Sequence, residues 1–179
     1  MTIADLDFRI VVLCLILKSG KAEILYFVYL KQAAIHTNET IQMIQYISED
    51  VMLPDFPKQE TGRWIKKTAL EYGKKTGEIA YIFCSDKHML EVNNQYLQHD
   101  YYTDIITFDY SEGTIISGDI FISIDTVKSN SVEFNVSFEE ELKRIMIHGI
   151  LHLCGQDDKT PEMRLEMTEK ENSALMKYE

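Results

Sequence analysis

The chain has 179 residues, of which 45% are hydrophobic and 26% are charged, and its formal net charge is −11. This composition provides enough apolar residues for the core of one compact domain and argues against intrinsic disorder. The acidity also argues against nonspecific binding to membranes or nucleic acids, so that any contact with a nucleic acid must use a local basic patch.

The beginning of the chain differs in character from the rest. Its two apolar runs, residues 10–17 and 24–30, are shorter than the roughly 18 residues that a membrane helix requires, and two early aspartates argue against a signal peptide. This segment could form a buried hairpin or helix pair, or the functional protein could begin at Met43, where MIQYISED resembles a first strand. We favour the second interpretation, in which residues 1–42 are an N-terminal extension that need not be native. Charged residues cancel within this extension, so the whole charge of −11 belongs to the domain at 43–179.

The three cysteines, Cys14, Cys84 and Cys154, show no paired spacing. Their odd number argues against a disulfide framework, and a reducing compartment is the expectation. Because no membrane segment is predicted either, we expect a cytoplasmic protein.

From Met43 onward, apolar patterns predict alternating strands and helices. Strands are expected at 44–48, 78–85, 103–110 and 119–123, and helices at 57–74, 86–97, 137–153 and 161–178. The strand at 78–85 is apolar on both faces, which favours a central place in the sheet. Strands interleaved with helices indicate an α/β (α+β) domain, in which about five helices cover a small mixed sheet of about four strands.

The helix at 57–74 has one apolar face and one basic face. Its basic residues, called the basic stripe below, are Arg63, Lys66, Lys67 and Lys74. In a lone helix such a stripe is most often a solvated surface, and on this pattern alone we would prefer that interpretation.

The helix at 137–153 has apolar residues on nearly every face, so it is expected to run through the interior. Ser137 and Glu140 form a capping-box pattern at its start, and Gly155 is placed to end it in a left-handed turn. His148 and His152 lie one turn apart on one face of this helix, where both imidazoles could bind one ion. The alternative is a pair of core histidines that bond to backbone carbonyls.

The turn at Gly155 could fold Asp158 back toward the two histidines. Two histidines and one aspartate would hold Zn²⁺ tetrahedrally and leave the fourth position to water, as hydrolytic zinc sites require. Zinc proteases carry the signature H-E-x-x-H, whose Glu is the general base. Gly149 stands at that position here, so a base must come from elsewhere.

Three segments resemble, in the same order, the signature segments of one family. HGILHLCGQDD (148–158) resembles the H-G-x-L-H-L-x-G-Y-D-H signature of the YbeY family. VNNQYLQHDYYTDIITF (92–108) is similar to the family's L-N-x-x-Y-R-x-K-D-x-P-T-D-V-L-S-F segment, and GDIFIS (118–123) resembles the G-D-I-x-I-S strand that follows it. The resemblance spans about residues 43–179. It implies the fold and function of bacterial rRNA maturation factors that are regarded as metal-dependent single-strand endoribonucleases.

The resemblance also implies one Zn²⁺ per chain at the C-terminal end of the central helix, with His148, His152 and Asp158 as ligands. The family's third ligand is usually His, and the aspartate here should make a bound water less acidic than three imidazoles would. The neighbouring Asp157 matches the family's own aspartate, so Asp158 is the better candidate ligand.

Other positions receive catalytic or supporting roles through the same resemblance. Asp104 is a candidate base or a residue that orients the metal ligands, although an aspartate that caps a turn is an equal alternative. The family's Arg is replaced by Leu97, which cannot clamp a phosphate, and His99 at the family's Lys position is a weaker substitute. Asn93 and Thr103 are expected to support the cleft.

The basic stripe is the expected path of the RNA, with a contribution to binding that weakens steeply with salt. Tyr101 and Tyr102 could stack on unpaired bases, although at least one of them is expected to be a core residue at a strand edge.

The function implied is a zinc-dependent endoribonuclease for 16S rRNA 3′-end maturation and for late assembly and quality control of the small ribosomal subunit. The expected partners are rRNA, the small subunit and ribosome assembly proteins, without a membrane. One alternative is a non-catalytic assembly factor with a structural zinc, which the net charge of −11 and Leu97 favour. Another is a metal hydrolase that acts on a small molecule or a peptide.

Overall fold

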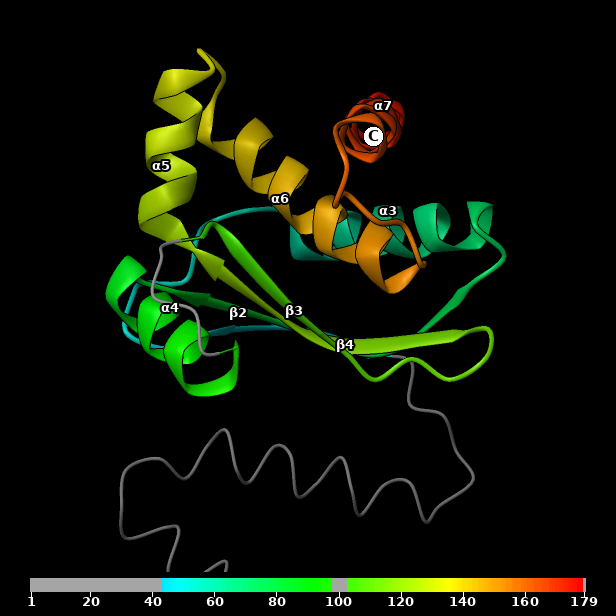
Figure 1. Ribbon diagram of the computed structural model, residues 1–179, viewed down its shortest axis with the longest axis horizontal. Coiled ribbons are helices and arrows are strands. Elements are labelled where there is room, and N and C mark those ends of the chain that lie inside the picture. Colours follow the sequence, from blue (N-terminus) through cyan, green and yellow to red (C-terminus); the bar gives the residue numbers. More distant parts are fainter. Residues whose placement is uncertain (1–42, 98–102, 179) are drawn as a thin grey trace, which may run out of the picture. The chain divides into compact units, whose positions relative to one another are not determined.

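The computed structural model describes residues 43–97 and 103–178 (Figure 1). Four strands form one sheet: β1 (Met43–Ser48), β2 (Lys75–Cys84), β3 (Ile105–Asp109) and β4 (Ile115–Ser123). Their order is β1-β2-β4-β3, with β1, β2 and β4 parallel and β3 antiparallel to β4. The expected mixed sheet of four strands is confirmed.

The strand β2 lies between β1 and β4, as its two apolar faces predict. Tyr81 and Phe83 on one of these faces are fully buried in the main core, and the Tyr81 hydroxyl donates a hydrogen bond of 3.0 Å to the carbonyl of Met146. The core therefore lies between this face of the sheet and the helix that contains Met146.

Five α-helices belong to the described residues, together with one π-helical turn. They are α3 (Lys58–Glu71), α4 (Asp86–Val92), α5 (Ile124–Glu133), α6 (Phe138–Leu153) and α7 (Pro161–Leu175), and the turn is η1 (Asn93–Leu97). Figure 1 shows α3, α6 and α7 over one face of the sheet and α4 on the opposite face. The helix α6 packs on β3, β4, α3, α5 and α7, which gives it the interior position expected from its apolar surface.

Some element bounds differ from those predicted. The first helix ends at Glu71 rather than 74, because Gly73 adopts a left-handed φ of 70° just after it. The strand β4 begins at Ile115 rather than at Asp119. Gly118 lies within this strand, where a Cβ would approach the carbonyl oxygen of Phe108 to 2.5 Å, so the glycine permits close packing of two strands.

The helix α5 was not predicted. Its sequence, IDTVKSNSVE, is rich in β-branched residues, serine and asparagine, which are weak helix formers. The Ser123 side chain caps it by accepting a hydrogen bond of 3.2 Å from the Thr126 amide, and packing against α6 and β4 supports it. Tertiary packing thus outweighs a weak local propensity.

None of the helices in the described ranges is long and apolar enough to cross a membrane. The expectations for residues 1–42, including a start at Met43, and those for His99, Tyr101 and Tyr102 concern parts of the chain outside the described residues.

Candidate metal centre

The two histidines of α6 lie where this helix leaves the core. Ser137 caps the start of α6 by accepting a hydrogen bond of 3.1 Å from the Glu140 amide. Buried residues such as Ile147 and Leu151 then fix the rotation of the helix. His148 and His152 stay partly accessible at the edge of this buried surface, with side chains 18% and 27% exposed.

The turn after α6 brings a carboxylate back toward the histidines. Gly155 adopts a φ of 86°, and its amide donates to the carbonyl of His152 at 2.8 Å, while the Gln156 amide donates to the carbonyl of Leu151 at 2.9 Å. These two bonds form a Schellman motif, which needs a residue in the left-handed region at Gly155. The chain reverses there, and Asp158 lies beside the imidazoles as the sequence predicted.

The three side chains converge on one point. The Nε2 atoms of His148 and His152 are 2.9 Å apart. The Asp158 carboxylate lies 3.8 Å from the first and 3.9 Å from the second. One ligand atom from each residue lies within 4.8 Å of the others, so the group can hold a metal ion.

The outer nitrogen of each imidazole already has a partner. His148 Nδ1 lies 2.7 Å from Glu171 Oε1, and His152 Nδ1 lies 2.9 Å from the carbonyl oxygen of Gln156. Both partners are acceptors, so in the neutral imidazoles these contacts assign a proton to each Nδ1 and leave each Nε2 with a lone pair. Two lone pairs that face each other repel, and a cation between them removes this repulsion.

The geometry and chemistry of the set fit a small divalent ion. Two ligand atoms of a tetrahedral zinc site lie about 3.3 Å apart when each bond is about 2.0–2.1 Å long, which is close to the separation of the two Nε2 atoms. Two imidazoles and one carboxylate are also a donor set that zinc accepts, with a position left for water or substrate.

The electrostatics around His148 favour positive charge. Burial lowers the pKa of its imidazole, but the hydrogen bond to Glu171 and the negative charge of that residue outweigh burial and raise the pKa, with smaller contributions from two aspartates. Surroundings that stabilise a proton at this imidazole also stabilise a bound cation.

The carboxylate of the neighbouring Asp157 already has other hydrogen-bond partners. It accepts a hydrogen bond of 2.9 Å from the Asp158 amide and pairs with Lys159 Nζ at 2.8 Å. The hydrogen bond with Lys159 and that with the Asp158 amide hold the pKa of Asp157 below its usual value. This arrangement supports the choice of Asp158 over Asp157 as the candidate ligand.

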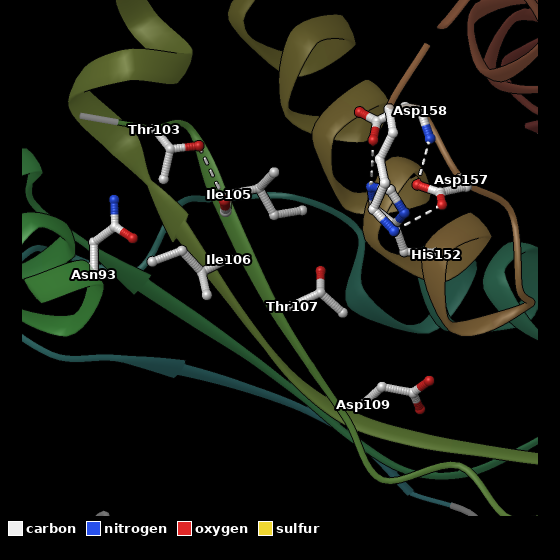
Figure 2. A pocket seen from close by; sticks show the side chains of 10 residues that line it. Asn93, Thr103, Ile105, Ile106, Thr107, Asp109, His152, Asp157 and Asp158 are labelled. Carbon is white, nitrogen blue, oxygen red and sulfur yellow. Dashed lines mark hydrogen bonds and ion pairs between the residues drawn. The ribbon is translucent and has the colours of Figure 1, made fainter. Parts of the chain in front are cut away.

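A pocket of ≈ 370 Å³ opens beside the cluster. In Figure 2, His152, Asp157 and Asp158 line one side, and residues of β3 line the other. The full lining is Asn93, Thr103, Ile105, Ile106, Thr107, Asp109, His152, Asp157, Asp158 and Lys159. Asn93 and Thr103 thus contribute to this pocket, as the resemblance implied.

Other predicted residues lie outside this pocket. Asp104 directly precedes β3, where its carbonyl accepts a hydrogen bond of 2.9 Å from the Ser123 amide and its carboxylate accepts one of 3.4 Å from Thr103 Oγ1. It does not line the pocket, and its catalytic role stays a prediction.

The basic stripe also lies away from the pocket. Arg63 and Lys67 on α3 are exposed, while Lys66 is partly buried. Lys74 follows α3, and its ammonium group donates a hydrogen bond of 2.8 Å to the carbonyl of Gly113. None of the four lines the pocket, so their contact with RNA stays a prediction.

Sequence reasoning missed Glu171, Lys159 and Thr107. Lys159 could have been suspected because it follows the acidic pair directly. Glu171 gave no local signal, since it lies on a separate helix, 23 residues beyond the histidine that it contacts.

Comparisons with known proteins agree with this architecture. The family described as endoribonuclease YbeY matches residues 43–179. An endoribonuclease YbeY of Phocaeicola vulgatus is 62% identical over 133 residues, which cover 74% of this chain and 96% of the relative. The protein of the same name in Bacteroides thetaiotaomicron is 59% identical over 132 residues, again 74% of this chain and 96% of the relative. A Thermotoga maritima protein, whose structure was solved in solution, is similar with a TM-score of 0.53 and 28% identity, covering 74% of this chain and 87% of that one.

Proposed function

The chain belongs to the YbeY family, and we propose that it is a cytoplasmic, zinc-dependent endoribonuclease that cleaves single-stranded RNA. Its proposed substrate is the 3′ region of 16S rRNA, during maturation and quality control of the small ribosomal subunit. The observation that carries the proposal is the convergence of two imidazole Nε2 atoms and one carboxylate at the wall of a pocket.

His148 and His152, through Nε2, and Asp158 would hold the metal. When bound, Zn²⁺ supplies a Lewis acid that polarises a phosphoryl oxygen and lowers the pKa of a water molecule toward neutrality. The protein's own contribution is to fix the ligands. Glu171 and the carbonyl of Gln156 hold the two imidazoles, and the turn at Gly155 places the carboxylate.

The pocket supports a substrate of limited width. A volume of ≈ 370 Å³ lies near the lower end of the range for small-ligand sites, which suits one nucleotide unit of an unpaired strand. Lys159 on the rim brings positive charge to a site that is otherwise rich in acids, and Asp157 fixes its ammonium group. Attraction to a phosphodiester is the expected role of this lysine.

An exposed aromatic ring in η1, the turn that also contributes Asn93 to the pocket lining, supports binding of unpaired bases. Tyr96 in η1 is 56% exposed, and its ring packs edge-on against Phe108 of β3 with 5.5 Å between the ring centres. Base stacking on such a ring tolerates any sequence and needs an unpaired base. The basic stripe on α3 would contact RNA that extends beyond the pocket.

The test compares wild type with His152→Ala on one RNA, offered as a single strand and as a duplex. We expect wild type with Zn²⁺ to cleave the single strand, and His152→Ala to stay folded and to lose this cleavage, because one of three metal ligands is gone. Circular dichroism checks the fold, and gel electrophoresis measures the cleavage.

Two results would overturn the proposal. Equal cleavage by the purified variant would assign the activity to a contaminant. A wild-type protein that binds zinc and the small subunit without cleaving RNA would indicate a non-catalytic assembly factor.

A further inference from the structure

A buried carboxylate of the last helix contacts one imidazole of the metal centre at the nitrogen that faces away from the candidate ion position. Glu171 on α7 is 7% exposed, and its Oε1 atom lies 2.7 Å from His148 Nδ1. Its other oxygen, Oε2, accepts a hydrogen bond of 3.1 Å from Arg144 Nη1. Each oxygen of this carboxylate therefore contacts one charged or chargeable group of α6.

The position of Arg144 explains how a carboxylate can be buried there. Arg144 precedes His148 by one turn on α6, and its Nη1 atom also donates a hydrogen bond of 2.9 Å to the side chain of Asn172. A buried carboxylate is costly unless a cation and hydrogen bonds accompany it. Arg144 supplies both, and Asn172 holds the guanidinium against α7.

The two imidazoles differ in what orients them. His152 bonds to the backbone carbonyl of Gln156, which the turn at Gly155 fixes and which no side-chain substitution removes. The partner of His148 is a side chain from another helix. The orientation of His148 thus depends on the docking of α7 against α6.

We propose that Glu171, held by Arg144, is a positioning residue of the metal centre. It keeps the proton of His148 on Nδ1, turns Nε2 toward the ion, and links the metal affinity to the docked position of α7. This inference rests on the metal site of the proposed function, but it does not depend on RNA cleavage. Outer partners of metal-binding histidines typically change the metal affinity by about 10–100-fold.

The central experiment measures the zinc affinity of the full chain by competition with a chromophoric chelator. Glu171→Gln keeps the shape of the side chain and an oxygen acceptor but removes the charge, and we expect its dissociation constant for Zn²⁺ to rise about 10–100-fold. Glu169→Gln, an exposed position on the same helix, is the matched control and should bind like wild type. Arg144→Gln should weaken binding by a smaller factor, because it acts through Glu171.

Thermal unfolding separates positioning from a merely structural role. Melting temperatures are measured for wild type and Glu171→Gln with chelator and with saturating Zn²⁺. A positioning role reduces the increment that zinc adds to the melting temperature, whereas a structural role lowers both temperatures equally and leaves the increment unchanged.

The outcomes also separate this inference from the proposed function. If Glu171→Gln binds zinc within about twofold of wild type, or if wild type binds none, the inference is overturned. If the variant loses affinity while wild type cleaves no RNA, the inference holds and the proposed nuclease function fails.

Discussion

Two clusters of acidic and polar side chains lie at the ends of helices and strands, and they differ in which of their polar atoms have hydrogen-bond partners. The first is the metal centre at the end of α6. The second, called the cap cluster here, lies where β1, β2 and β4 end and where α4 and α5 begin, and its carboxylates are Asp50, Asp86 and Asp125. The cap cluster has three carboxylates, whereas only one of the three candidate ligands of the metal centre is a carboxylate.

The carboxylates of the cap cluster are bound to neighbouring donors. Asp86 Oδ1 accepts hydrogen bonds from the hydroxyls of Ser123 and Thr126, the latter at 2.7 Å. Asp50 accepts from the amide of Ser85 at 2.9 Å and from its hydroxyl. These bonds connect the caps of α4 and α5 to the ends of the strands.

The metal centre shows the reverse arrangement. Its outward atoms, the two Nδ1, are bound to acceptors, while its inward atoms, the two Nε2, face each other at 2.9 Å. The candidate metal centre thus differs from the structural cluster in that its unbonded lone pairs converge on one point. The number of carboxylates does not by itself identify a metal site.

The largest expected effect comes from removing a ligand of the metal centre. His148→Ala should lower the zinc affinity by more than about 100-fold, beyond the usual effect of an outer partner. Metal analysis after dialysis measures the loss, and Asp125→Asn in the cap cluster is the control that should retain zinc. Full zinc content in the His148→Ala protein would contradict the assignment of this imidazole as a metal ligand.

A substitution in the cap cluster should cost stability and leave the metal unaffected. Asp86→Ala removes a carboxylate that accepts two hydroxyl hydrogen bonds, and we expect a loss of about 2–3 kcal/mol in the free energy of unfolding. Urea unfolding in the presence of chelator measures this loss. A parallel fall in zinc affinity would mean that the two clusters are not separate in function.

The smallest effect concerns Glu141, a buried acid that lies 4.0 Å from Arg144 Nε. Within the described part of the chain, its Oε2 atom has no hydrogen-bond partner, and burial raises its pKa above the ordinary value of 4.5. Because the folded pKa is raised, the protonated form is favoured in the folded state. The contribution of Glu141 to stability is therefore most favourable below pH 4.5 and is lost as the pH rises through its folded pKa.

Glu141→Gln should abolish this pH dependence. At pH 7 the free energy of unfolding of the variant should exceed that of wild type by on the order of 1 kcal/mol. Urea unfolding at a series of pH values measures both. If instead the variant is less stable at pH 7, then the hydrogen bond with Asn130 and the charge of Arg144 compensate the buried carboxylate of Glu141 in full.

Local patterns of the sequence were sufficient to predict the part of the metal centre that lies on α6 and in the turn after it. The spacing of His148 and His152, the cap at Ser137 and the turn at Gly155 each depend on residues within one or two helical turns, and the structure has all of them in the expected place. The same holds for the central strand β2.

The rest of the site depends on contacts between distant parts of the chain. The approach of Glu171 requires the packing of α7 on α6, and the pocket wall at Thr107 and Asp109 requires the pairing of β3 with β4. No local propensity encodes these distances. The helix α5 was missed for a related reason, since its packing rather than its composition makes it helical.

Gly149, which directly follows His148 on α6, faces the sheet. A Cβ at this position would lie 2.9 Å from Ile120 Cγ2 and 3.1 Å from Ile105 Cδ1, and Ile120 is fully buried. A glutamate there, as in the zinc proteases, would press its Cβ against the side chains of Ile120 and Ile105. A side chain at position 149 therefore requires the isoleucines of β3 and β4 to shift or α6 to move outward, so replacing this glycine alone would disturb the packing that holds the two histidines in place.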